Sequence, residues 1–146
     1  MSETVGRYRF IEDIAIADCA IEVDGADLDD LFGTAATALA EIMVDPATVP
    51  ITLERRVTLE AEEPDLLLYD WLAELILRKD RDREIFPVAE VRVGTGRPCT
   101  LVARVHGGAI DVERMALRND PKAVTLHAFT LEQHAGGWRA QVVIDI

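Results

Sequence analysis

Residues 51–61 alternate between apolar and polar side chains almost without interruption, and this pattern constrains the fold more than any other feature of the sequence. The apolar face begins at Ile51 and ends at Ala61, and Arg55 is its one charged residue. A period of two residues indicates a strand with one face buried and one face in water, which is typical of an antiparallel sheet. Such a strand needs apolar cover on its buried face.

Two amphipathic segments can supply that cover. The first is predicted over residues 28–43, where apolar side chains recur every three or four positions after Asp27, a good N-cap residue. Asp45-Pro46 is expected to end it. The second helix is predicted over residues 64–79, with Pro64 at its first position and apolar side chains around most of its circumference. A helix with so narrow a polar stripe is expected at the centre of the core.

Most of the other segments are predicted to be strands or extended chain. Residues 88–93 and 99–105 form a predicted hairpin, while residues 107–121 show no clear pattern. The other strands are predicted over 17–23, 123–131 and 138–146, with an extended segment over 8–16. The fold class expected is α+β, a mainly antiparallel sheet with two packed helices in a single domain covering residues 1–146.

The charge of the chain limits its partners. With 27 acidic and 15 basic side chains, the net charge is −12 at pH 7. The first fifty residues hold 11 of the acidic side chains and only two arginines. A field of this sign repels phosphate backbones, so direct nucleic-acid binding is not expected. A cationic protein partner or a bound cation fits better.

The sequence favours a cytoplasmic setting. No stretch approaches the roughly 20 apolar residues of a membrane span, and the N-terminus lacks the apolar region of a signal peptide. Cys19 and Cys99 lie far apart in the chain, and neither belongs to a CxxC pair. They are therefore expected to be buried, reduced thiols.

No enzyme constellation is visible in the sequence. Ser2 is the only serine, and Asp18 beside Cys19 is expected to raise the pKa of that thiol, so neither residue type suits nucleophilic catalysis. A metal-dependent hydrolase would need a general base, for which only His127 and Glu22 offer themselves. The three histidines lack zinc-binding spacing: His106, His127 and His134. No catalytic machinery is therefore visible in the sequence, and a metal-dependent hydrolase stays open as an alternative.

A few charged positions remain as candidates for a functional site. Asp18 lies near the start of the first predicted strand, and Asp145 is followed only by Ile146 and its α-carboxylate. If these carboxylates came together they would repel unless a cation neutralised them, and all-oxygen ligands suit calcium or magnesium. Lys122 is one of only two lysines and precedes a predicted strand. Solvated strand residues and a solubilising lysine remain the alternative.

Four segments of the chain resemble those of the archease family. They are Gly25–Asp45, Tyr69–Leu75, Lys122–His127 and Gly137–Ile146, and they keep the family's order over most of the chain. The Lys-Ala-Val-Thr-x-His run and the Asp-Ile terminus are more specific than the Tyr-x-Trp-Leu helix. Archeases are small acidic partners of RtcB-type RNA ligases.

The resemblance implies an accessory protein and not an enzyme. Such a protein promotes guanylylation and multiple turnover of the ligase in transfer RNA splicing and RNA repair. It also implies a fold related to strand-helix-strand-strand (SHS2-like) modules. The family's metal site, described with calcium, corresponds here to Asp18, Asp145 and Ile146, the last through a backbone or terminal oxygen. Ca²⁺ is thus the expected ion, with Mg²⁺ or Mn²⁺ as alternatives. The family lysine corresponds to Lys122, which is expected to contact the ligase or a phosphate.

The chain departs from the family at the first metal ligand. Archeases usually show His-Thr-Ala-Asp there, whereas residues 13–18 read Asp-Ile-Ala-Ile-Ala-Asp. Asp13 therefore competes with Asp18, and we prefer Asp18 because its distance from Gly25 is that of the family. No family residue is assigned within 107–121. The alternative function is a chaperone-like or scaffold module without ligase-specific activity.

Overall fold

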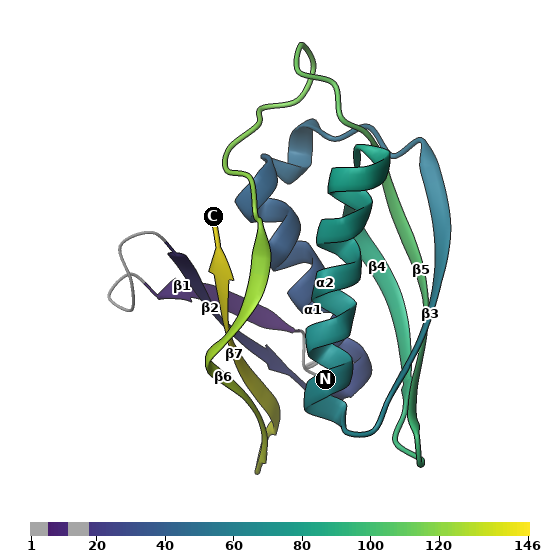
Figure 1. Cartoon of the computed structure of the whole chain (residues 1–146), viewed down its shortest axis with the longest axis vertical. Coiled ribbons are helices and arrows are strands. Elements are labelled where there is room, and N and C mark those ends of the chain that lie inside the picture. The colour runs from purple at the N-terminus through teal and green to yellow at the C-terminus, as the bar shows by residue number, and fades with distance from the viewer. Residues whose placement is uncertain (1–5, 12–17) are drawn as a thin grey trace, which may run out of the picture.

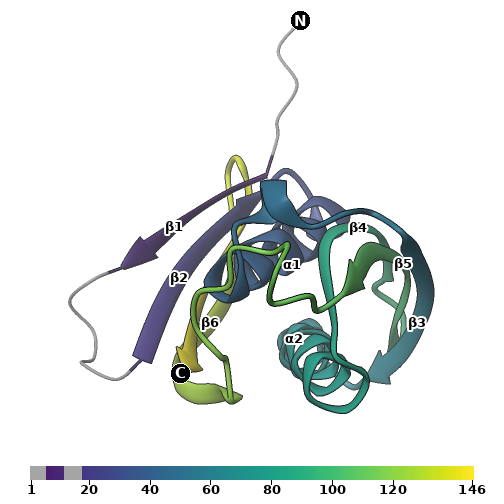
Figure 2. The ribbon, with the colours of Figure 1, turned by 90° about the horizontal axis from the view of Figure 1, so that it is seen from above.

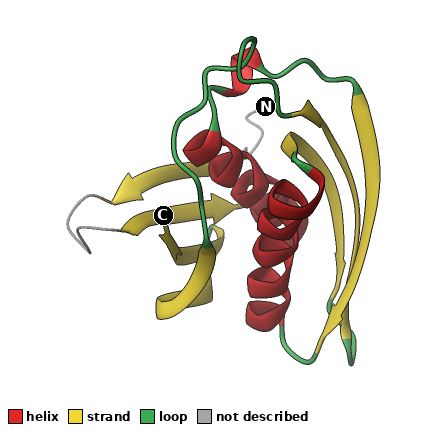
Figure 3. Cartoon of the chain, turned by 45° about the horizontal axis from the view of Figure 1, so that its top comes forward, coloured by secondary structure: helices red, strands yellow, loops and turns green. Residues whose placement is uncertain are grey.

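The computed structural model describes residues 6–11 and 18–146. Two antiparallel sheets lie on either side of a pair of helices (Figure 1, Figure 3). One sheet has the strand order β1-β2-β7-β6 and the other the order β3-β5-β4. The elements are β1 (Arg7–Ile11), β2 (Asp18–Gly25), α1 (Leu28–Met43), β3 (Leu53–Ala61), α2 (Pro64–Asp82), β4 (Glu84–Gly94), β5 (Cys99–Ala109), β6 (Ala123–His134) and β7 (Gly137–Asp145). The predicted α+β class is confirmed, with the strands divided between two sheets.

Helix α1 begins where the sequence predicts. Asp27 accepts a hydrogen bond from the backbone nitrogen of Asp30 at 2.8 Å, which satisfies one of the free donors of the first turn. The helix ends at Met43, before the predicted breaker. Asp45 caps a short 3₁₀ turn, Pro46–Thr48, instead. The helix is buried along most of its length, so it forms the layer between the two sheets together with α2 (Figure 2).

Helix α2 joins the two halves of the core. It begins at Pro64 and ends at Asp82, three residues beyond the predicted end, where Arg83 adopts the left-handed conformation with φ 58°. Trp71 is fully buried, and its Nε1 donates a hydrogen bond of 2.9 Å to the carbonyl oxygen of Phe32 in α1. The buried side chains of both helices and both sheets form one continuous cluster.

Strand β3 keeps the alternation seen in the sequence, although it starts at Leu53, two residues later than predicted. Arg55, the exception on the apolar face, turns to Glu84 at the start of β4. Its Nη2 lies 2.9 Å and its Nε 3.2 Å from the two carboxylate oxygens. The charged exception is therefore neutralised at the sheet margin rather than buried alone.

Strand β5 extends further than predicted. It runs to Ala109, so Gly107 and Gly108 lie within the strand and the irregular segment is confined to residues 110–122. A Cβ atom on Gly107 would lie only 1.8 Å from the carbonyl oxygen of Ile85 in β4. The glycine therefore allows a close backbone approach at the bulge in β4, and it does not mark the end of the strand.

Strand β6 contains a wide bulge that the sequence did not indicate. Its pairing with β7 shifts between Thr125 and Thr130, and Ala128 has a φ of 53°. Gln141 of β7 donates a hydrogen bond of 3.0 Å to the carbonyl oxygen of Ala128. Phe129 turns towards α2 and packs edge-on against Tyr69, with ring centroids 6.1 Å apart. The bulge thus redirects β6 onto the helix.

Both cysteines are free, as expected, with Cys99 buried and Cys19 half-buried. Burial raises the pKa of the Cys19 thiol. The predicted direction is therefore right, but its cause is burial rather than the neighbouring Asp18. Among the described residues, no helix combines the length and the hydropathy needed to cross a membrane.

Candidate functional site

The candidate site lies at one end of the four-stranded sheet. Asp18 opens β2 and Asp145 closes β7, and the antiparallel register makes them direct cross-strand partners. Both carboxylates therefore project from the same face of the sheet as nearest neighbours. Both residues are half-buried. Two aspartates separated by most of the sequence thus meet because β2 and β7 lie side by side.

The other two predicted site residues lie at the same end. Ile146 follows Asp145 directly, and the C-terminus lies beside the start of β6 (Figure 1, Figure 2). The backbone nitrogen of Lys122 donates a hydrogen bond of 2.7 Å to the carbonyl oxygen of Asp145. Lys122 is exposed, whereas Ile146 is half-buried. The structure therefore brings together all four residues predicted for the site.

The chemistry of this arrangement fits a hard cation. Like charges directly opposite each other on a sheet destabilise it, and a cation between two carboxylates removes that repulsion. In the part of the chain that the structure describes, no three side chains of histidine, cysteine, aspartate or glutamate are grouped to hold a metal ion. For a cation bound at this place, Asp18 and Asp145 would supply two ligand side chains, and a third oxygen would come from Ile146. Carboxylate and carbonyl oxygens are the ligands that Ca²⁺ and Mg²⁺ prefer.

Thr125 places a further oxygen close to this end of the sheet. It pairs with Val143 in the β6–β7 register, two residues before Asp145 on the same face. Its hydroxyl is buried and has no hydrogen-bond partner among the described residues. A buried hydroxyl without a partner costs about 1–3 kcal/mol. The face that carries the two aspartates therefore also holds an unpaired polar group.

The sequence reasoning missed the residue that holds Lys122 in place. Lys79, near the end of α2, is 4% exposed and is the buried charged residue of the described chain. Its Nζ bonds the carboxylate of Asp120 and lies 2.5 Å from the carbonyl oxygen of Pro121. It therefore fixes the segment that leads into Lys122. Its position in the helix could have indicated this burial, because Lys79 follows the buried Leu75 by four residues on the apolar face of α2.

The segment 110–121, to which no family residue was assigned from the sequence, is also tied to α1. The backbone nitrogens of Arg118 and Asn119 donate to carbonyl oxygens at the end of that helix, at 2.8 and 2.9 Å. Met115, within the segment, is buried. These contacts and those of Lys79 carry the chain from β5 across the end of the helices to the candidate site.

Other candidates from the sequence do not join this site. Asp13, the competitor for the first metal ligand, lies outside the described residues. His127 is exposed within the β6 bulge. The carboxylate of Glu22 lies 2.9 Å from Nε of Arg9. Of the two residues suggested for a hydrolase, His127 is thus a surface residue and Glu22 belongs to an ion pair.

Comparison with known proteins identifies the fold and its relatives. A model of the archease protein family (MTH1598/TM1083) matches residues 8–146. The chain belongs to the archease family. The protein archease of Archaeoglobus fulgidus is 36% identical over 140 residues, covering 96% of this chain and 99% of the relative. The archease of Methanosarcina mazei is 33% identical over 143 residues, covering 96% of each.

Solved archease structures share the fold. The solution structure of protein 1598 of Methanobacterium thermoautotrophicum has a TM-score of 0.78 and 31% identity, covering 95% of this chain and 98% of that one. A Thermotoga maritima crystal structure, described as an archease and possible chaperone, has a TM-score of 0.63 and covers 94% and 98%. At 20% identity it shows the fold alone. The family resemblance seen in the sequence and the predicted fold class are both confirmed.

Proposed function

We propose that this archease is an accessory protein that activates an RtcB-type RNA ligase by promoting its guanylylation and multiple turnover in transfer RNA splicing and RNA repair. The observation that carries the proposal is the meeting of Asp18, Asp145, Ile146 and Lys122 at one end of the four-stranded sheet. These are the residues that match the family's metal ligands and lysine. In this proposal the protein itself is not an enzyme, and it acts in the cytoplasm.

The two aspartates and an oxygen of Ile146 would hold a divalent cation, Ca²⁺ first and Mg²⁺ or Mn²⁺ as alternatives. The cation neutralises the carboxylates and so fixes their orientation. Lys122 stands next to this group, because its backbone is bonded to Asp145, and its ammonium is free to meet a phosphate or an acidic group of the ligase. The net charge of −12 steers the protein towards a cationic partner.

A guanylylation assay tests the proposal. The ligase of the same organism is mixed with GTP and Mn²⁺, with and without substoichiometric amounts of this protein. We expect the wild type to give multiple turnovers of the ligase. We expect Asp145→Asn and Lys122→Ala each to reduce the stimulation about 100-fold. Glu132→Gln is the matched control, since Glu132 is exposed at the other end of the same sheet, opposite Arg139.

The outcomes separate activation from other roles. Stimulation by Asp145→Asn equal to that by the wild type would show that the aspartate site is wrongly assigned. No stimulation by the wild type, with a ligase shown to be active alone, would favour the chaperone-like or scaffold role. That alternative has one supporting observation, the description of the Thermotoga maritima relative as a possible chaperone. It predicts suppression of client aggregation that is independent of divalent ions.

A further inference from the structure

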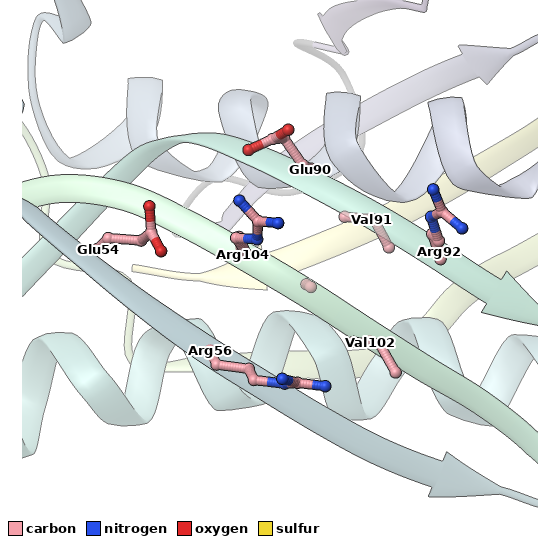
Figure 4. A pocket seen from close by; sticks show the side chains of 8 residues that line it. Glu54, Arg56, Glu90, Val91, Arg92, Val102 and Arg104 are labelled. Carbon is pink, nitrogen blue, oxygen red and sulfur yellow. The ribbon is translucent and has the colours of Figure 1, made fainter.

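The outer face of the three-stranded sheet carries a cluster of positive charge far from the aspartates. Arg56 of β3, Arg104 of β5 and Arg92 of β4 line a pocket of about 430 Å³ (Figure 4). All three are exposed, and they surround Val102, whose exposed fraction is 41%. The two helices cover the opposite face of this sheet (Figure 1), so the arginines face solvent.

The arrangement of these arginines is unfavourable in itself. Arg56 and Arg104 are direct cross-strand partners, and like charges in that position destabilise a sheet. Within residues 6–11 and 18–146, none of the three guanidinium groups lies within 4.0 Å of a carboxylate oxygen. Among the described residues Arg7, Arg83, Arg97 and Arg118 likewise have no such partner, whereas six other arginines do: Arg9, Arg55, Arg78, Arg81, Arg114 and Arg139. Arg104 is attracted to the carboxylate of Glu90 only across a longer distance.

Two carboxylates at this pocket contact His106. Glu90 is the cross-strand partner of Arg104, but it bonds Nε2 of His106 at 2.8 Å. Glu54 lies 3.6 Å from Nδ1 of the same imidazole. Figure 4 shows Glu54 at one end of the pocket and Glu90 beside Arg104. Both glutamates line the pocket together with the three arginines, so its balance of charge stays positive.

We propose that this arginine pocket binds a small anion with two or three linked phosphate groups. Guanidinium groups bind phosphate through paired hydrogen bonds, and three of them around one pocket match several phosphates better than one. Of the described residues that line the pocket none is aromatic, so it lacks the surfaces on which nucleic-acid bases stack. The net charge of −12 also repels a long polyanion. The proposal does not depend on the ligase-activating function.

Calorimetric titration with inorganic tripolyphosphate at low ionic strength tests this site. We expect binding by the wild type, and about tenfold weaker binding by Arg56→Gln and by Arg104→Gln, the effect of one lost charge-assisted hydrogen bond. Glu90→Gln removes a neighbouring negative charge and is expected to bind more tightly. Arg7→Gln is the matched control, because Arg7 is an exposed arginine on β1 of the other sheet.

Further titrations decide whether the bound phosphates belong to an inorganic polyphosphate or to a nucleotide. Equal affinity for tripolyphosphate and ATP would support recognition of the phosphates alone, and tighter binding of ATP would support a nucleotide as their source. The proposal is overturned if tripolyphosphate does not bind, or if Arg7→Gln weakens it as much as Arg104→Gln does. It is also overturned if a twelve-nucleotide single-stranded RNA binds more tightly than tripolyphosphate and depends on the same arginines.

Discussion

The two sheets of this archease each place two like charges directly opposite each other, with opposite signs. In the four-stranded sheet the pair is Asp18 and Asp145, and in the three-stranded sheet it is Arg56 and Arg104. The aspartates are half-buried at the end of their strands, whereas the arginines are exposed in the middle of theirs. Both pairs weaken the sheet that holds them when no ligand is present.

The difference between the pairs lies in what surrounds them. The aspartates have the backbone of Lys122 and Ile146 beside them, which supports the bare cation with oxygen ligands that we propose there. The arginines surround an open pocket and have their nearest carboxylates bound to His106. A hydrated or polyatomic anion fits there. The sign of an unneutralised cross-strand pair, together with its surroundings, thus indicates the class of ligand.

The largest effect is expected from breaking the core that the two sheets share. Trp71→Ala should lower the free energy of unfolding by about 3–5 kcal/mol, because it removes a fully buried indole from between the sheets. Trp138, at the start of β7, is then the one remaining tryptophan. Its fluorescence during urea unfolding reports on the four-stranded sheet, and amide exchange in β5 reports on the other. Loss of stability in one sheet only would contradict a common core.

A smaller effect is expected from removing one charge from each pair. Asp18→Asn and Arg104→Gln should each raise the free energy of unfolding by about 0.2–1 kcal/mol in the absence of ligand, since each relieves a like-charge contact. Added Ca²⁺ should stabilise the wild type and Arg104→Gln but not Asp18→Asn. Urea unfolding in chelator and in excess Ca²⁺ measures both. Destabilisation of either variant in chelator would show that its pair is already compensated within the protein.

The smallest effect is expected from changing His106, which contacts Glu54 and Glu90 at the arginine pocket. The hydrogen bond from His106 lowers the pKa of Glu90. The stabilisation that comes from ionised Glu90 is therefore fully present at pH values above the ordinary pKa of a glutamate. It is lost as the pH falls through the lowered pKa. In His106→Gln the midpoint of Glu90 should move up towards its ordinary value. NMR titration of the side-chain carboxyl measures this shift, and an unchanged midpoint would place the cause elsewhere.

Local features of the sequence predicted most of the elements but few of their contacts. The alternation of residues 51–61 and the N-cap Asp27 are set by neighbouring residues, so the sequence revealed them. The extension of β5 depends on how closely Ile85 approaches Gly107. The adjacency of Asp18 and Asp145 depends on which strands pair. No local pattern encodes either, and only the family resemblance linked the two aspartates before the structure did.

The roles of single residues were harder to predict for a related reason. Lysine is a residue type found mostly at the surface, but Lys79 occupies a core-facing position of its helix. The buried carbonyl that it contacts belongs to Pro121, 42 residues away. The three arginines of the pocket each look like solvated strand positions when taken alone. Their significance appears only when the register places Arg56 opposite Arg104.

Strand β7 is the last element along the chain, yet it lies between β2 and β6 in the sheet. During synthesis from the N-terminus, β2 therefore waits for a partner on that side until β7 has been made. The β4–β5 hairpin and β3 can pair well before then. An incompletely made chain would expose the edge of β2, which invites pairing with other chains. Loss of β7 would likewise divide the four-stranded sheet at its middle rather than trim its margin.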